Sequence, residues 1–503
     1  MSEFILFLYF AVLIIPSIFG LHRYWLVFRY YRTKSKAPSA PDFKTLKTIP
    51  FVTIQLPLYN ERYVAQRIIE SACRFDYPRD RFEIQVLDDS TDETVSIVER
   101  QVKHFQELGF QIEQVRRADR VNFKAGALEE GLKKAKGEFV AVFDADFLPQ
   151  SDFLQKTIPH FYEHPKIGMV QARWGHLNRD YSLLTQAQSL LLDGHFVIEH
   201  SVRNRSGCFF NFNGTAGIWR KACIEETGGW SGDTLTEDID LSYRAQMAGW
   251  QFIYLEDLVV PAELPVDING LKSQQHRWAK GSIQVARKLL PALIKGPYPL
   301  RVKCEAIFHL AANINYLLIA ILAFLMPLAV YVRYQEGWLS LWWLDVPLFM
   351  SATFSISYFY YHSQKSITSD FFSRIKCIPV SLAIGIGLAI NNSKAVIEGF
   401  MADRGEFTRT PKYAIVDRSD SWKGKKYCGK WNLVSLIELA LTVHLTAAVF
   451  YCLKEGLYFS LPFLLLFQVG FFYTSTLSIL QGIYSFGLSP EASQIPSELP
   501  QIS

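Results

Sequence analysis

Hydrophobic and polar residues follow two different patterns along this chain. Between residues 34 and 300, short runs of β-branched and apolar residues, typical of strands, alternate with stretches whose apolar residues recur every three to four positions, typical of helices. We expect strands at 51–56, 83–88, 110–115 and 138–144, with helices between them. This order predicts an α/β domain whose mostly parallel sheet has helices on both faces.

Long apolar runs flank this region on both sides. Each is long enough to cross about 30 Å of hydrocarbon as a helix, and they lie at 4–20, 306–332, 340–361, 432–453 and 457–482. The first run has no basic segment before it and no small-residue cleavage site after it, which favours a retained anchor over a removed signal peptide. The α/β domain is therefore expected to be inserted between transmembrane helices.

The apolar stretch 377–398 is ambiguous, because its polar segment 391–394 would lie deep in lipid if the stretch crossed the bilayer. Basic residues gather at 23–36 and again at 399–431, and such clusters favour the cytosolic side of a membrane. Between two cytosolic segments the number of crossings is even. The stretch 377–398 is thus predicted to be an interfacial or re-entrant helix, and the α/β domain is predicted to be cytosolic.

The predicted organisation has six parts. They are an N-terminal transmembrane anchor (1–30), the α/β domain (31–300), spans with an interfacial or re-entrant helix (301–398), a basic cytosolic loop (399–431), two further spans (432–485) and a disordered tail (486–503). The composition, 50% hydrophobic and 15% aromatic, agrees with a membrane-embedded chain. A formal net charge of only +4 gives no reason to expect nucleic acid as a partner.

Acidic residues follow two of the predicted strands. Asp88 and Asp89 close one strand in QVLDDSTD, and Asp144 and Asp146 close another in VFDADF. Ligands of parallel sheets bind beyond the carboxyl ends of the strands, so these carboxylates are expected near one another. Such a pair can share Mg²⁺ or Mn²⁺, which completes its shell with substrate phosphates and water. The pattern indicates a nucleotide diphosphate ligand, although Asp at a strand end is also an ordinary turn or cap residue.

A third acidic cluster lies in LTEDIDLSYRAQMAGW. Thr236 stands where it can cap a helix, and Glu237 and Asp238 follow it directly. Asp240 precedes Arg244 by four residues, so a surface ion pair between them explains it. Glu237 and Asp238 have no equally good structural explanation. A carboxylate here, facing a metal-bound diphosphate, can accept a proton from an attacking hydroxyl. The cluster therefore indicates group transfer from a nucleotide donor.

The sequence QQHRW combines polar donors, a cation and a large aromatic ring. On a helix, Gln274, Arg277 and Trp278 fall at i, i+3 and i+4 and share one face. Arg277 can bind a leaving diphosphate, Gln274 can hydrogen-bond sugar or phosphate oxygens, and Trp278 can lie under a sugar ring. The simpler alternative for Trp278 is a packed core aromatic.

The order of these motifs resembles a known family. LPLYNE, VLDDS, KAGALEEG, FDADF, FNGTAGIWR, TEDIDLSYR and QQHRW are similar, in order and spacing, to the cytosolic domain of processive family 2 glycosyltransferases of the cellulose synthase superfamily. The resemblance is closest to the cellulose-synthase-like branch that makes glucomannan, mannan or glucan backbones, and FTRTPKY (407–413) resembles a cytosolic loop motif of such enzymes. It implies a GT-A (Rossmann-like) fold, inversion at the anomeric carbon, a UDP- or GDP-sugar donor and Mg²⁺ or Mn²⁺.

Carried over by motif, the resemblance also implies a role for each site residue. The catalytic residues would be Asp238, as the base, and its neighbour Glu237. Donor binding would fall to Asp88, Asp89, Lys124, Gly126, Asp144, Asp146 and Arg277, with the metal on Asp144 and Asp146. The acceptor would contact Asn213, Gly214, Gln274 and Trp278.

The activity implied by the resemblance is processive polymerisation of a β-linked glucan, mannan or glucomannan, with a β-1,4 linkage favoured. The donor would be UDP-glucose or GDP-mannose, and the polymer would pass through the membrane. The implied partners are the nucleotide sugar, the growing β-glycan and the lipid bilayer, with a homo-oligomer or accessory envelope proteins left open.

Two alternative functions stay open. A non-processive enzyme would transfer one sugar to a membrane lipid, and it would need a route from the bilayer to the site rather than a ring under a glycan. A nucleotide-binding membrane transporter would predict internally repeated halves, and no such repeat is visible in the sequence.

Overall fold

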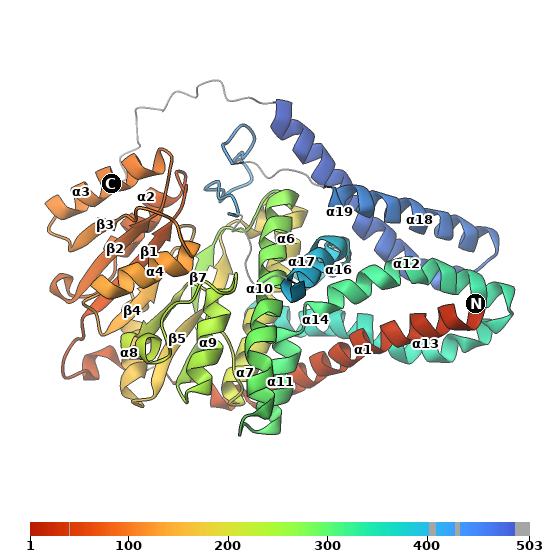
Figure 1. The fold of residues 1–503 in the computed structure, drawn as a ribbon, viewed down its shortest axis with the longest axis horizontal. Helices are drawn as coiled ribbons and strands as arrows, with labels where there is room; N and C mark the ends of the chain where they lie inside the picture. The colour runs from red at the N-terminus through yellow and green to blue at the C-terminus, as the bar shows by residue number, and fades with distance from the viewer. Residues whose placement is uncertain (40, 402–408, 428–432, 488–503) are drawn as a thin grey trace.

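The structure is a computed structural model that describes residues 1–39, 41–401, 409–427 and 433–487 (Figure 1). A sheet with its covering helices lies on one side, and long helices extend from it on the other. Several predicted features lie outside the described residues, namely Arg404 and Lys430 of the basic loop and residues 488–503 of the tail.

The sheet of this described part has seven strands in the order β3-β2-β1-β4-β6-β5-β7. Their bounds are β1 (Val52–Leu58), β2 (Phe82–Asp88), β3 (Ile112–Val115), β4 (Phe139–Val142), β5 (Ile167–His176), β6 (Gly217–Arg220) and β7 (Gln251–Ala262). β6 runs antiparallel to both of its neighbours, while the other pairings are parallel. The expected mostly parallel sheet is thus confirmed, with β6 as the exception.

The first four strands lie where the sequence pattern predicts them, with ends shifted by at most two residues. Both faces of β4 are buried, so apolar residues occupy consecutive positions of this strand. In β4, Phe139 and Ala141 join the core on one face, and Val140 and Val142 join the core on the other. Because helices cover both faces, ligands can reach the sheet at its edge.

Helices of the α/β part cover these two faces. α2 (Ala65–Cys73) and α3 (Thr94–Glu107) pack on one face, and α4 (Phe123–Lys134) and α9 (Glu237–Met247) pack on the other. Shorter segments complete this part: α5 (Phe153–Thr157), α6 (Leu183–Asp193), a π-helical turn at Gly194–His200, α7 (Ser201–Arg205) and α8 (Lys221–Glu226).

The remaining helices follow β7 or precede the sheet. They are α1 (Ser2–Arg32), α10 (Ile268–Lys295), α11 (Leu300–Leu310), α12 (Ile314–Gln335), α13 (Trp342–Phe349), α14 (Ser355–Ile367), α15 (Phe371–Ile375), α16 (Ile378–Gly387), α17 (Ala389–Met401), α18 (Val434–Lys454) and α19 (Leu461–Gly487). In Figure 1, α10 stands between the sheet and the long helices.

Among the described residues, five helices are long and apolar enough to cross a membrane: Ser2–Arg32, Ile314–Gln335, Trp338–Ile367, Val434–Lys454 and Tyr458–Ile483. They overlap the five predicted apolar runs. The ambiguous stretch at 377–398 falls in a helix pair bent by 46°. Its asparagines are buried in protein, and the Asn391 amide donates to the Lys272 carbonyl of α10 at 2.9 Å. The two asparagines are therefore covered by protein, with α10 as one neighbour, whereas the Lys394 side chain is exposed.

One predicted apolar run differs in the structure. The run expected at 306–332 is divided, because α11 ends at Leu310 and α12 begins at Ile314. The Asn315 amide, in the first turn of α12, donates back to the Ala312 carbonyl of the intervening turn at 2.9 Å. Asparagine favours turns and caps because its side chain competes for backbone groups. This competition ends α11 before the apolar stretch is complete.

Candidate functional site

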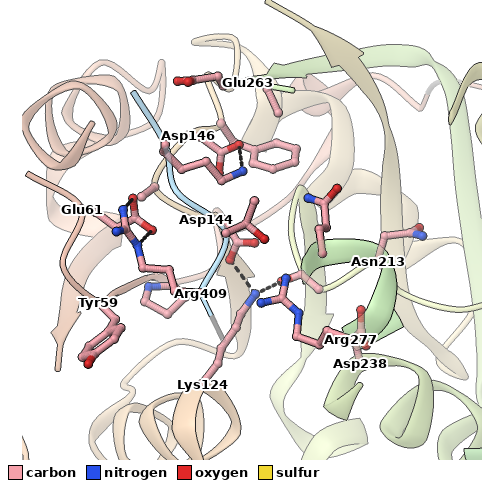
Figure 2. A pocket seen from close by; sticks show the side chains of 18 of the residues that line it. Tyr59, Glu61, Lys124, Asp144, Asp146, Asn213, Asp238, Glu263, Arg277 and Arg409 are labelled. Carbon is pink, nitrogen blue, oxygen red and sulfur yellow. Dashed lines mark hydrogen bonds and ion pairs between the residues drawn. The ribbon is translucent and has the colours of Figure 1, made fainter. Parts of the chain in front are cut away.

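A pocket at the carboxyl edge of the sheet gathers nearly all of the predicted site residues (Figure 2). It is lined by loops after β1 and β4, by the starts of α4 and α9, and by one face of α10. The predicted residues that line it are Asp89, Lys124, Asp144, Asp146, Asn213, Gly214, Glu237, Asp238, Gln274, Arg277 and Trp278. Residues as far apart in sequence as Asp89 and Trp278 thus meet because parallel strands end at one edge.

Lys124 lies at the centre of the pocket. Its ammonium group donates to Asp144 Oδ1 at 2.5 Å and to the Gly214 carbonyl at 2.8 Å. Burial alone would lower the pKa of the Lys124 amine, but the Asp144 and Glu237 carboxylates outweigh burial and raise it. Lys124 therefore supplies a fixed positive charge between the carboxylates of the sheet edge and those of α9.

Asp238 is the second residue of α9 and faces Lys124 and Gly214. Burial, and next the negative charge of Glu237, raises the pKa of the Asp238 carboxyl to about 7. Burial raises the pKa of Glu237 as well. With this pKa the carboxyl group can both release and accept a proton near neutral pH, which suits a general base.

Gly214 allows the close approach that this arrangement requires. Its φ of +80° is a conformation that glycine adopts without a steric cost. A Cβ at this position would lie 3.1 Å from Asp238 Oδ2 and 3.4 Å from Lys124 Nζ. A side chain here would therefore be strained and would crowd both charged groups.

The start of α9 departs from the expected cap. Thr236 occupies the N-cap position, but its side chain makes no capping hydrogen bond, and its hydroxyl is buried without a partner among the described residues. Asp240 pairs with Arg244 at 2.7 Å as predicted, yet Asp240 is fully buried rather than on the surface. The burial follows from the packing of α9 between the sheet and α10.

Two predicted donor residues do not line the pocket. Asp88 is fully buried, and its carboxylate accepts from the Ser90 amide at 3.0 Å and from Gln114 at 2.8 Å. Asp88 is the last residue of β2 and points into the protein, so only Asp89, which follows the strand, lines the pocket. Gly126 is a packing position, because a Cβ there would lie 2.2 Å from the Val121 carbonyl oxygen.

Asp144 and Asp146 fit the chemistry of a divalent metal with substrate phosphates. Each carboxylate already faces a cation: Asp144 pairs with Lys124 at 2.5 Å and Asp146 pairs with Lys412 at 2.6 Å. Within the described residues, no three His, Cys, Asp or Glu side chains gather into a metal cage. Mg²⁺ is commonly held by one or two carboxylates together with phosphates and water, and Asp144 and Asp146 supply the carboxylates of such a donor set.

The QQHRW segment lies on α10 as predicted, and Gln274, Arg277 and Trp278 all line the pocket. Burial lowers the pKa of the Arg277 guanidinium, while the nearby Glu237, Asp144 and Asp238 carboxylates act in the opposite direction. The Trp278 ring centroid lies 6.4 Å from that of Trp174, a pocket residue of β5 that the sequence did not point to. Two indoles thus share one wall of the pocket.

Residues 409–412 form another part of the pocket that was not predicted as a site. Arg409 donates to both carboxylate oxygens of Glu61, at 2.9 and 2.6 Å, and Lys412 donates to Asp146 (Figure 2). These residues belong to the FTRTPKY motif, of which Phe407 and Thr408 lie outside the described residues. The basic motif was the signal that could have identified them, but its partners lie more than 250 residues earlier in the chain.

Part of the chain is similar to known glycosyltransferases. Residues 50–281 match the model of glycosyltransferase-like family 2. The chain is 46% identical over 250 residues to glucomannan 4-beta-mannosyltransferase 2 of Arabidopsis thaliana, covering 49% of this chain and 47% of the relative. It is 42% identical over 271 residues to glucomannan 4-beta-mannosyltransferase 1 of Oryza sativa subsp. japonica, covering 53% and 52%. The matched part thus spans about half the length of each curated relative.

A solved structure has a similar fold. The mannosyltransferase PcManGT from Pyrobaculum calidifontis, in complex with GDP-Man and Mn²⁺, superposes with a TM-score of 0.51 at 21% sequence identity, covering 77% of this chain and 98% of that one. The mixed sheet with its flanking helices is a GT-A fold, as predicted. The resemblance to glucomannan-type synthases seen in the motifs is confirmed as well, and residues 50–281 are similar to glycosyltransferase-like family 2.

Proposed function

We propose that the protein is an inverting glycosyltransferase that extends a β-linked mannan or glucomannan from a nucleotide sugar. The observation that carries this proposal is the convergence of Asp238, Lys124, Arg277 and the Asp144–Asp146 pair in one pocket. A base, two cations and a metal-binding pair are the groups that transfer from a sugar diphosphate requires. The names of the relatives, which are glucomannan 4-beta-mannosyltransferases, support the same substrate class.

Asp238 acts as the base in this proposal. It takes the proton of an acceptor hydroxyl while the hydroxyl oxygen attacks the anomeric carbon from the face opposite the diphosphate. The bond between that carbon and the diphosphate oxygen breaks, and the diphosphate leaves with the electron pair. Because attack and departure are on opposite faces, an α-linked donor gives a β-linked product.

Lys124 and Arg277 stabilise the departing diphosphate with positive charge held in place before the reaction. A divalent cation, when bound, adds Lewis-acid stabilisation of the phosphate oxygens, and Asp144 and Asp146 would hold it. GDP-mannose is the favoured donor, ahead of UDP-glucose, because the structural neighbour holds GDP-Man and Mn²⁺. Asn213, Gln274 and Trp278 would contact the acceptor glycan.

The catalytic pocket is proposed to face the cytosol, where nucleotide sugars are available, and the long helices to anchor it. The basic residues between 23 and 36 support this orientation. The aromatic wall of Trp278 and Trp174 favours a glycan acceptor over a lipid, because indole rings stack on sugar faces. Passage of the polymer through the membrane is part of the same proposal.

Product analysis tests this function. Purified full-length protein in proteoliposomes, given radiolabelled GDP-mannose, is expected to make an ethanol-insoluble polymer that an endo-β-1,4-mannanase degrades. UDP-glucose alone should yield much less product. A chloroform-soluble product with one sugar would instead establish the lipid-transfer alternative, and absence of transfer from both donors would reject the proposed activity.

The pH dependence of transfer should report on Asp238. The base acts only when deprotonated, and the pKa of this carboxyl is raised to about 7. We therefore expect kcat/KM to fall about tenfold per pH unit below that value, whereas an ordinary Asp would give a flat profile there. Initial rates measured from about pH 5 to 8 test this decline in kcat/KM. Donor binding is followed separately over the same range. A flat profile would contradict the shifted base.

A further inference from the structure

The side chain of Asn213 is held by two histidines. His200 Nε2 donates to Asn213 Oδ1 at 2.7 Å, and Asn213 Nδ2 donates to His195 Nε2 at 3.3 Å. The two imidazole centroids lie 4.3 Å apart. An asparagine amide can rotate by half a turn and exchange its oxygen and nitrogen. When His200 Nε2 carries a hydrogen and His195 Nε2 does not, the amide has a single favourable orientation.

This assignment is consistent with neutral histidines. His195 uses Nδ1–H to donate to Glu199 at 2.8 Å, which leaves its Nε2 lone pair for the Asn213 amide. Burial lowers the pKa of His200 well below its usual value, and the positive charge of His195, when protonated, and of Arg203 would act in the same direction. His200 is completely buried, so its neutral ring keeps one N–H for the asparagine oxygen.

The local backbone explains why both rings reach the same asparagine. Residues Gly194–His200 form a π-helical turn inserted between α6 and α7. A π-helix bonds residues five apart, and such turns are frequent at functional sites. His195 and His200 are five apart, so the turn places both rings on one side, next to Asn213.

The support for His195 extends to the first helix of the chain. Arg203 bonds to Glu199 at 3.3 Å and to Glu305 of α11 at 2.9 Å, and Glu305 bonds to His22 of α1 at 2.9 Å. Burial opposes ionisation of Glu199, but Arg203 and His195 outweigh it and hold its pKa below the usual range. A buried ionic chain therefore fixes the Glu199 carboxylate that orients His195.

We propose that His195 and His200 are positioning residues of the acceptor site, which fix the Asn213 amide so that its second N–H can donate to a hydroxyl oxygen of the terminal acceptor sugar. Asn213 lines the pocket, and no described residue takes this second N–H. The inference rests on the proposed glycosyl transfer. It assigns acceptor recognition, not donor binding or chemistry, to the π-helical turn.

Two substitutions of His200 separate positioning from packing. His200→Phe keeps a ring but removes the N–H donor, whereas His200→Gln places an amide N–H near the position of Nε2. For His200→Phe we expect the KM for β-1,4-mannotetraose to rise about tenfold, with the KM for GDP-mannose unchanged within about twofold. His200→Gln is expected to restore most of the acceptor affinity. Tyr254→Phe is the packing control, because the Tyr254 ring lies 5.2 Å from His200 and makes no bond to Asn213.

Calorimetric titration of mannotetraose and of GDP into the same proteins gives a readout that does not need turnover. Loss of mannotetraose binding in His200→Phe, with GDP binding intact, supports the inference. Equal effects on both ligands, or no recovery in His200→Gln, overturns it. If His200→Phe does not fold, His195→Phe removes the acceptor of the Asn213 amide at a half-buried position, with the same expected result. A wild-type protein that binds mannotetraose but transfers no mannose would reject the proposed function while the titrations still test the positioning.

Discussion

Replacing Asp238 by asparagine is expected to abolish sugar transfer while donor binding is retained. Asparagine has the same shape, and its oxygen can still accept from the Ile239 amide, as Asp238 Oδ1 does at 2.9 Å. It cannot accept the acceptor proton, and loss of a general base typically lowers kcat by about 10²- to 10⁴-fold. Initial rates with labelled GDP-mannose measure the loss, and calorimetric titration of GDP measures the binding.

Asp233→Asn is the matched control for this change. Asp233 lies five residues earlier, is exposed, and pairs with Lys288 at 3.2 Å, so its charge should matter little to transfer. Near-normal turnover of Asp238→Asn would show that Asp238 is not the general base. Glu237→Gln would then be the next variant to measure, since Glu237 lines the same pocket.

Removal of divalent metal is expected to stop transfer completely. The leaving diphosphate gathers negative charge, and without a divalent cation Lys124 and Arg277 alone would have to balance it. Activity should vanish in excess EDTA and return with Mn²⁺ or Mg²⁺. Asp146→Asn should raise the metal concentration needed for half-maximal activity, because it removes one of the two proposed ligands.

Asp152→Asn provides the control for the metal experiment, because Asp152 is a partly exposed acid that pairs with Lys156 on α5, outside the pocket. Its metal requirement should equal that of the wild type. Full activity after exhaustive chelation would contradict the metal assignment, and Lys124 and Arg277 would then balance the charge of the diphosphate without a metal ion.

The first half of the sheet could be predicted because its strands are short runs rich in β-branched and apolar residues, although β1 and β2 also contain buried polar residues. β7 could not, because Glu256 and Asp257 interrupt its apolar pattern. Glu256 is compensated only in the folded protein, by Arg205 at 2.5 Å and by Tyr30 of α1 at 2.6 Å. A strand that contains charged residues is easily mistaken for a loop when the ion-pair and hydrogen-bond partners of those residues lie elsewhere in the chain.

The site residues also divide into those that the local sequence pattern predicts and those that depend on contacts distant in sequence. Residues at strand ends and helix starts could be predicted, since local pattern alone places them at the carboxyl edge. The contact between Arg409 and Glu61 joins residues 348 apart, and no local pattern indicates it. Within QVLDDS, the sequence does not reveal that Asp88 points into the protein and Asp89 into the pocket, because that choice depends on the twist and register of β2.

Helix α10 has a practical consequence for work with isolated parts of the protein. The family match ends at residue 281, midway along Ile268–Lys295. Beyond that point, Lys288 bonds to Asp240 of α9 at 2.8 Å, and a Cβ at Gly399 of α17 would lie only 2.9 Å from that of Ile283. A soluble fragment cut at the homology boundary would split the helix that carries Arg277 and Trp278, so the catalytic unit ends inside the helical bundle rather than at the edge of the sheet.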